Sequence, residues 1–411
     1  MNKLLITLFI ISLSLHTQDV LAVATTTKKV ATKQVTSGKS KVTSNKTQVK
    51  SNKLPIIKPY TVSAWIPYWK GAQAVDEAVA HIDKIDIVSP FAYEVDETGV
   101  LQDKLKMYQE PFSRLVKAAK DKKKLLVPTI LWTDKKAMQS VLSDEELRGV
   151  MIEDIGKELD KYKADGIDID FEGKSAETKD SYSAFIKEAS VAMHKKGKLL
   201  ICTIESRIPL ESRYATVTPE LMKSMEYSND FKVLAKACDQ VRFMAYDQMT
   251  TDQKLIKEKG NGELYKPVAD VDWVEKVITL AMESFKWKSI VIGVPTYGNE
   301  YEIVEDGTQI NNTVSISSAS SSVANIKYKF KGSMNWYYAD QKAKELGIKP
   351  TRNSAGELSY TFTENNHKYL VWYSDAKAIA DKVKVAKAYK VGGVAIFKVD
   401  GNNDPDIWRK L

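Results

Sequence analysis

Residues 165–172 decide the fold class, and they read Asp165-Gly166-Ile167-Asp168-Ile169-Asp170-Phe171-Glu172. Successive side chains of a strand point to opposite faces, so Asp168, Asp170 and Glu172 share one face and the apolar residues between them share the other. The apolar face can pack against a layer of helices, which places the three acids inside a closed sheet. Because three carboxylates in a confined interior cannot all stay ionised, we expect at least one to hold a proton near neutral pH.

Short apolar runs, each followed by an amphipathic stretch, repeat along the chain as in consecutive βα units. They predict eight strands, at residues 62–67, 85–91, 125–130, 166–171, 199–204, 241–245, 290–294 and 393–397. Eight parallel strands over about 350 residues favour an α/β fold of the (β/α)8 TIM barrel type. No G-x-G-x-x-G follows any of these strands, which excludes the main dinucleotide-binding alternative.

The stretch between the seventh and eighth strands is too long for a single helical crossover. We therefore expect a small α+β insertion over about residues 299–372, beside the mouth of the barrel. Its predicted strands are residues 326–330, 358–363 and 369–373, and its predicted helix is residues 334–346.

The first 56 residues differ in composition from the rest. Lys3, an apolar run at 4–15 and the triplet Ala22-Val23-Ala24 predict a signal peptide over residues 1–24, with a retained membrane anchor as the alternative. Residues 25–56 are rich in Lys, Thr and Ser and contain no aromatic or acidic residue, so we expect a disordered linker. It acts either as a solvated tether or as a contact to anionic envelope polymers. The barrel domain is expected over residues 57–411.

Charge and cysteine content narrow the function classes. The formal net charge is +8, but ten lysines against one acid, Asp19, lie within the first 58 residues, so the remainder carries about −1 and nucleic acid is not an expected partner. Cys202 and Cys238 are the two cysteines, and we expect buried thiols because nothing in their positions argues for a disulfide. With four scattered histidines, the sequence predicts neither a metal site nor a cofactor.

The predicted signal peptide indicates where the protein acts. We expect a secreted or envelope-associated monomer, extracellular or periplasmic, without a membrane span in its mature form.

Residues 165–172 resemble the signature of the family 18 glycoside hydrolases, the chitinase-like superfamily, at all four acidic positions. Segments 244–247, 293–298 and 392–397 are similar to the family's sixth, seventh and eighth strands. Two segments depart from the chitinase pattern: residues 128–132 read Pro-Thr-Ile-Leu-Trp instead of Ser-x-Gly-Gly, and Phe397 replaces a tryptophan under the sugar. The order of the motifs and segment 90–93 resemble bacterial envelope- and spore-associated members more than classical chitin degraders.

The resemblance implies retaining, substrate-assisted hydrolysis of β-linked N-acetylhexosamine glycans, such as chitin-like polymers, peptidoglycan or a related envelope polysaccharide. Glu172 would protonate the leaving oxygen, Asp170 would bind the acetamido N–H, and Asp168 would set the protonation state of Asp170 through a shared proton. Tyr246 would donate to the acetamido carbonyl. The expected substrate-binding residues lie near predicted strand ends or in the insertion: Asp247, Met244, Tyr297, Trp65, Trp132, Phe397 and Trp372.

Two alternatives stay open. A non-catalytic carbohydrate-binding protein of the envelope would keep the barrel and the cleft, but such lectin-like members typically lose the last acid of the motif, and Glu172 is present. Glu205 and Arg207, just past the fifth strand, fit either a cleft position or a surface ion pair.

Overall fold

The computed structural model describes residues 53–260, 264–304, 327–400, 404 and 406–411. The predicted signal peptide and residues 25–52 of the predicted linker lie outside this part of the chain, so both stay predictions. Within the described ranges, no helix has the length and apolar character needed to cross a membrane.

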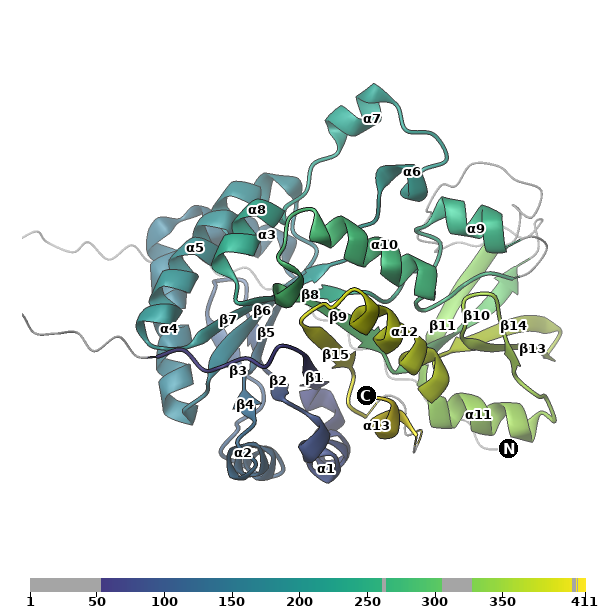
Figure 1. Cartoon of the computed structure of the whole chain (residues 1–411), viewed down its shortest axis with the longest axis horizontal. Coiled ribbons are helices and arrows are strands. Elements are labelled where there is room, and N and C mark those ends of the chain that lie inside the picture. Colours follow the sequence, from purple (N-terminus) through teal and green to yellow (C-terminus); the bar gives the residue numbers. More distant parts are fainter. Residues whose placement is uncertain (1–52, 261–263, 305–326, 401–403, 405) are drawn as a thin grey trace, which may run out of the picture. The chain divides into compact units, whose positions relative to one another are not determined.

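A closed sheet of parallel strands forms the centre of the fold (Figure 1). Its strands are β1 (Thr61–Ile66), β2 (Ile87–Val95), β5 (Thr129–Trp132), β6 (Gly166–Phe171), β7 (Leu199–Glu205), β8 (Gln240–Met244), β9 (Ile290–Pro295) and β15 (Gly393–Phe397). Strand β1 pairs in parallel with both β15 and β2, which closes the barrel. The predicted (β/α)8 barrel is therefore confirmed. The third predicted strand is divided into β4 (Leu125–Leu126) and β5 around Pro128, which has no N–H to offer the ladder.

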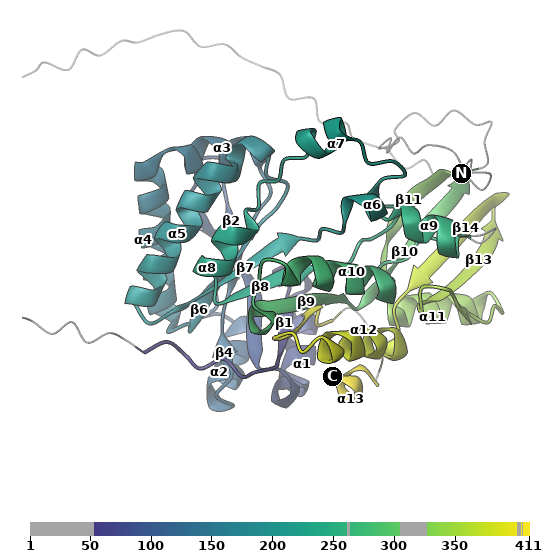
Figure 2. The same ribbon diagram turned by 45° about the horizontal axis from the view of Figure 1, so that its top comes forward.

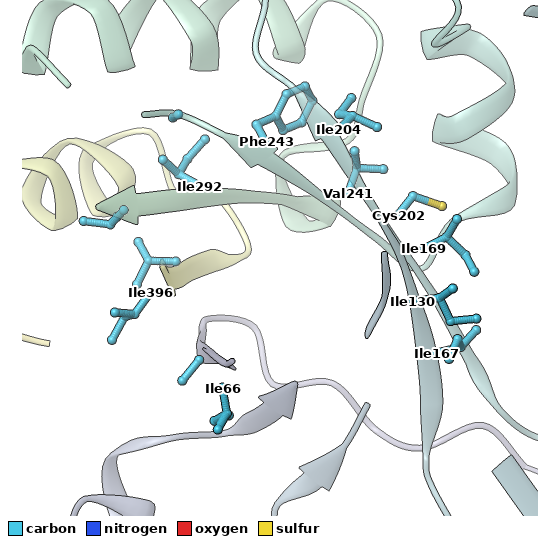
Figure 3. Packing of buried hydrophobic residues seen from close by; sticks show 14 of the residues in the cluster. Ile66, Ile130, Ile167, Ile169, Cys202, Ile204, Val241, Phe243, Ile292 and Ile396 are labelled. Carbon is cyan, nitrogen blue, oxygen red and sulfur yellow. The ribbon is translucent and has the colours of Figure 1, made fainter. Parts of the chain in front are cut away.

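Helices surround the barrel, and the long ones are α1 (Gly71–Ala80), α2 (Phe112–Asp121), α3 (Lys135–Ser143), α4 (Glu145–Tyr162), α5 (Lys179–Lys195), α10 (Val271–Met282) and α12 (Ala376–Ala388). Short helices are α6 (Leu210–Arg213), α7 (Pro219–Ser224), α8 (Phe231–Ala237), α9 (Gln253–Lys259) and α13 (Ile407–Lys410), and β3 (Leu101–Asp103) pairs antiparallel with β2. Apolar strand residues fill the layer between sheet and helices; Figure 3 labels, among others, Ile130, Ile167, Ile169, Cys202, Val241 and Phe243. Burial of this layer is the main stabilising contribution to the barrel.

The predicted insertion forms a second sheet between β9 and β15. Its antiparallel strands, in the spatial order β11-β10-β14-β13-β12, are β10 (Tyr297–Val304), β11 (Lys327–Asn335), β12 (Thr351–Arg352), β13 (Leu358–Glu364) and β14 (His367–Tyr373). Helix α11 (Trp336–Glu345) lies against this sheet (Figure 2), and its buried Ala339 and Ala343 pack on it. The α+β insertion is therefore confirmed.

One buried acid, Glu357, ties the insertion to the barrel. Its carboxylate accepts hydrogen bonds from the N–H of Val268 at 2.9 Å and from Nε1 of Trp372 at 2.7 Å, and it forms an ion pair with Lys382 at 3.2 Å. Trp372 is 1% exposed and its indole N–H is already used. Its predicted role in sugar binding is therefore corrected: it anchors the insertion.

The two cysteines correct a second expectation. Cys202 on β7 and Cys238, just after α8, form a disulfide with an S–S distance of 1.99 Å. Both are buried, as predicted, but they are not free thiols. The bond joins two neighbouring βα units, because Cys202 on β7 is paired with Val241 of the adjacent strand β8. A separation of 36 residues says nothing of this adjacency until the strand order is known.

We predict that the disulfide contributes substantially to stability. Closing a loop with a sequence separation of 36 removes unfolded-state entropy worth roughly 3–4 kcal/mol. Replacing both cysteines with serine should lower the free energy of unfolding by about that amount in urea titrations. The unfolded wild-type protein should contain no reactive thiol without reductant, and two reactive thiols in that thiol assay would contradict the bond.

Candidate active site

The three acids of β6 occupy one face of the strand, as predicted. Asp168 and Asp170 are fully buried in the barrel interior, and Glu172 is half-buried just after the strand end. The alternating Ile167, Ile169 and Phe171 pack toward the helices. The strand therefore carries acids from the barrel centre up to its mouth.

Asp168, the deepest acid, is held by four donors. Its Oδ2 accepts hydrogen bonds from Trp65 Nε1 at 3.0 Å, Thr129 Oγ1 at 2.9 Å and Arg242 Nη1 at 2.9 Å. Its Oδ1 accepts from Thr203 Oγ1 at 2.7 Å. The side chains of Asp168 and Arg242 are both 0% exposed, so this is a fully buried ion pair.

Arg242 is a site residue that the sequence analysis missed. It lies on β8 between Val241 and Phe243, which face the helices, so strand alternation alone would have placed it in the barrel interior. No hydrogen bond joins Asp168 to Asp170 in the described chain, because the Asp168 oxygens are occupied by other donors. The shared proton expected between the two aspartates stays a prediction.

Neither Asp170 nor Glu172 forms an ion pair among the described residues, although the Lys174 ammonium opposes the rise of both pKa values. Asp170 Oδ1 is buried and has no hydrogen-bond partner among the described residues. Burial, followed by the charges of Glu172 and Asp168, raises the pKa of Asp170 well above its usual value. Burial also raises the pKa of Glu172, with Glu205 and Asp247 adding to the effect. Both groups therefore favour the protonated form more than an ordinary surface carboxyl does.

Glu205, at the end of β7, holds the turn that follows Glu172. Its Oε1 accepts a hydrogen bond from the Gly173 N–H at 2.8 Å, and its Oε2 accepts from Asn229 Nδ2 at 2.8 Å. The ammonium of Lys174, whose side chain is 0% exposed, lies 3.9 Å from Oε2. Burial opposes the charged form of Glu205, but Lys174 and these donors hold its pKa below the usual value. Glu205 is therefore a cleft residue and stays ionised.

Arg207 forms no ion pair among the described residues and lines a hollow that shares Glu205 and Arg213 with the cleft. Its guanidinium stacks on Tyr227 at 3.8 Å and Phe231 at 4.3 Å from the ring centres, and Nη2 donates to the Asn229 carbonyl at 2.6 Å. Burial lowers its pKa to about 10. Arg207 thus stabilises the segment that carries Asn229.

Four predicted residues gather at the ends of β8, β9 and β15. The Tyr246 and Phe397 rings stack with centroids 5.1 Å apart, and the Tyr297 hydroxyl donates to Asp247 Oδ1 at 2.7 Å. Burial raises the pKa of Tyr246 well above its usual value, so its hydroxyl keeps its proton and can donate. Aromatic surface and hydroxyl donors thus lie beside the acids.

A cleft of about 400 Å³ opens above these groups. Its lining includes the predicted residues Asp170, Glu172, Met244, Tyr246, Asp247 and Phe397, together with Trp69, Leu131, Glu205 and Arg213. Tyr297 lines an adjoining hollow. The structure therefore brings these predicted residues to one mouth of the barrel, at the carboxyl ends of the strands.

Two predicted tryptophans do not reach the cleft. Trp65 is 1% exposed and lies below it, bonded to Asp168. Trp132 is equally buried and packs edge-on against Phe171 in the layer between sheet and helices. The prediction that Trp132 lines the cleft is therefore wrong. Trp132 lies two residues after Ile130 and so shares the strand face that points to the helices, whereas Leu131, on the other face, lines the cleft. The described residues contain no group of three or more His, Cys, Asp or Glu side chains that could hold a metal ion.

We predict that Arg242 and Asp168 are energetically coupled. Arg242→Met leaves the Asp168 charge buried without its cation, which should cost about 3–5 kcal/mol of the free energy of unfolding. Adding Asp168→Asn should recover part of this loss, because it removes the orphaned charge. Urea titrations of both single variants and the double variant test this, and strictly additive losses would contradict the coupling.

Comparison with known proteins places this site in a family. The model of the glycosyl hydrolases family 18 matches residues 63–402. An uncharacterised glycosylase, YvbX of Bacillus subtilis, is 24% identical over 253 residues, 61% of each chain. The cortical fragment-lytic enzyme of the same organism is 23% identical over 278 residues, 66% of this chain and 54% of that one. The chain thus spans between about half and two thirds of the length of these curated relatives.

Solved structures share the fold. The Bacillus cereus spore cortex-lytic enzyme SleL superposes with a TM-score of 0.64 at 18% identity, covering 85% of this chain and 73% of SleL. A class V chitinase from Pseudomonas fluorescens Pf-5 superposes with a TM-score of 0.68 at 20% identity, covering 86% and 98%. The family match covers most of the barrel, including the acid strand, the cleft and the insertion. The chain therefore belongs to family 18 of the glycosyl hydrolases.

Proposed function

We propose that this protein hydrolyses β-linked N-acetylhexosamine glycans with retention of configuration, using the substrate's own acetamido group as the nucleophile. One observation carries the proposal: Asp170 presents a buried oxygen that has no hydrogen-bond partner in the described part of the chain, and it lines the same cleft as Glu172. An acetamido N–H is a donor that fits such an acceptor. A carboxyl group with a raised pKa beside it is suited to general acid catalysis.

In the proposed reaction, Glu172 donates its proton to the leaving glycosidic oxygen while the C1–O bond breaks. The acetamido carbonyl oxygen attacks the same anomeric carbon and forms an oxazolinium, whose N–H is held by Asp170. Ionised Asp170 stabilises the positive charge that develops. Glu172, now a carboxylate, then removes a proton from water, which attacks C1 and reopens the ring with net retention.

The residues around the acids have supporting roles. The Tyr246 hydroxyl donates to the acetamido carbonyl, and its ring, stacked on Phe397, gives an apolar floor for the pyranose. Met244 and Asp247 contact the same sugar, and Tyr297 orients Asp247 through its hydroxyl. Asp168 and Arg242 act from below by fixing β6 to β8.

An envelope polysaccharide is the substrate class that we favour. Relatives named as cortical fragment-lytic and spore cortex-lytic enzymes support this choice. A buried disulfide supports export, because such bonds persist in oxidising compartments outside the cytosol. The predicted signal peptide agrees with that location.

We predict that Glu172→Gln abolishes turnover while binding persists. The amide keeps the shape of the side chain but has no transferable proton, so the rate should fall roughly 10²–10⁴-fold. Reducing ends released from N-acetylglucosamine oligomers and from purified peptidoglycan glycan strands measure the rate, and calorimetry measures binding. Asp170→Asn should also reduce the rate strongly, because it loses the charge that stabilises the oxazolinium.

Glu153→Gln is the matched control, because Glu153 is an exposed acid on α4 that pairs with a surface lysine, Lys157. It should retain the wild-type rate. If Glu172→Gln kept most of its activity while its binding collapsed, the protein would be a saccharide-binding barrel whose acids only line the cleft. An inverted anomer of the product, seen by NMR, would contradict the substrate-assisted route.

We predict that Glu205 sets the position of the alkaline limb in the pH profile of kcat/KM. Its negative charge helps to raise the pKa of Glu172, so Glu205→Gln should lower that pKa. The general acid then loses its proton at lower pH, and the alkaline limb moves to lower pH. The glutamine keeps an acceptor for the Gly173 N–H, and Glu153→Gln again serves as control. An unchanged or upward-shifted limb would refute this assignment.

A further inference from the structure

A second hollow, of about 630 Å³, adjoins the cleft on the side of the insertion. It shares Trp69, Asp247 and Phe397 with the cleft, so the two form one continuous trough. The rest of its lining comes from the turn after β1, from Tyr297 at the start of β10, from the β11–α11 junction and from the end of β15. Two of these residues, Lys70 and Lys398, are cationic.

The charges along this trough are unevenly distributed. The charged residues that line the cleft are Asp170, Glu172, Glu205, Asp247 and a single cation, Arg213. The hollow replaces three of these acids with two lysines and retains only Asp247. A negatively charged group is therefore disfavoured over the acids and favoured at the lysines.

The two lysines differ in how they are held. Lys398 is fixed by Asp400, with its Nζ 3.1 Å from each carboxylate oxygen, and by Asn335 at 3.4 Å. Lys70 forms no ion pair with any residue in the described ranges. Burial lowers the pKa of Lys398, and the charge of Lys70 adds to this effect, so the two ammonium groups lie close enough to repel. An anion between them would relieve that repulsion.

Exposed aromatic rings line the same hollow. Trp69 is 46% exposed and Tyr338 is 59% exposed, so both rings present apolar surface to the hollow. Rings of this kind pack against the apolar face of a pyranose, and Asn335 and Ser333 add polar groups to the wall. The hollow thus combines features that recognise a sugar with features that recognise an anion.

We propose that this hollow binds a sugar unit bearing a carboxylate, next to the unit held over Asp170, and that Lys70 is its main specificity-determining residue. The inference rests on the proposed function, because it assumes that a glycan lies along the trough. It refines the substrate to a glycan in which a neutral N-acetylhexosamine neighbours an acidic unit. Lys398, already paired with Asp400, positions the site, and Lys70 supplies the uncompensated charge.

Binding to the inactive Glu172→Gln protein tests the proposal. The probes are a tetrasaccharide of alternating N-acetylglucosamine and N-acetylmuramic acid with free lactyl carboxylates, its lactyl carboxamide, and the same chain with an acidic dipeptide on each lactyl group. We expect the free acid to bind roughly fivefold more tightly than the carboxamide, with the preference shrinking as salt is added. If only the affinity for the probe with acidic dipeptides depended on Lys70, the carboxylate that binds Lys70 would belong to the peptide and the proposal of an acidic sugar would be wrong.

Substitution of Lys70 separates a charge effect from a general loss of binding. Lys70→Gln should bring the acid-to-carboxamide affinity ratio close to one, and Lys70→Arg should keep most of the preference. Lys384→Gln removes an equal charge from an exposed position on α12 and should leave the ratio unchanged. Equal affinity for all three probes, or a preference that Lys70→Gln leaves intact, would overturn the proposal.

Hydrolysis by the wild-type protein, measured separately, distinguishes the two proposals. A Lys70-dependent preference without any release of reducing ends would refute the proposed function and leave the acidic-sugar site standing. If the wild-type protein hydrolysed both the acid and the carboxamide, and the inactive variant bound both with equal affinity, the acidic-sugar site would be refuted and the proposed function would stand.

Discussion

The buried ion pair between Asp168 and Arg242 is the constraint on which the rest of the site depends. Burying a carboxylate in a low-dielectric interior is costly unless a cation and hydrogen bonds compensate it, and Asp168 has both. With the deepest charge compensated from β8, the same strand can carry Asp170 and Glu172 toward the mouth. The pair also links β6 to β8 across the barrel interior, so the acids and the aromatic floor are held in one frame.

The rim of the site is fixed by longer-range anchors. The disulfide joins β7 to the turn between α8 and β8, beneath the segments that carry Glu205 and Tyr246. Glu357 fastens the insertion to the loop before α10 and to α12, which holds one wall of the trough in place. A cleft assembled from separate loops needs such fastening, because misplaced catalytic groups lose much of their effect.

Strand alternation explains both what the sequence predicts and where it fails. It places the three acids of β6 correctly, and it would also have placed Arg242, whose neighbours Val241 and Phe243 are apolar. Nearness to a strand end predicts Trp132 in the cleft, but Trp132 shares the strand face of Ile130 and therefore packs against the helices. The disulfide and the Glu357 contacts join residues that become neighbours only through the closed strand order and the folded insertion. Local sequence patterns therefore do not predict these contacts.

Under the proposed mechanism, substrate binding itself separates the roles of the two upper acids. Both have a raised pKa, mainly through burial. A sugar that covers the cleft excludes water from both, which favours the neutral form of each carboxyl. Asp170, however, gains the acetamido N–H on its free oxygen, and a hydrogen bond to a charged acceptor favours ionisation. Glu172 faces the leaving oxygen, an acceptor, and so keeps its proton. The same bound sugar thus drives one acid toward its charged form and the other toward its protonated form, which is the division of labour that substrate-assisted hydrolysis requires.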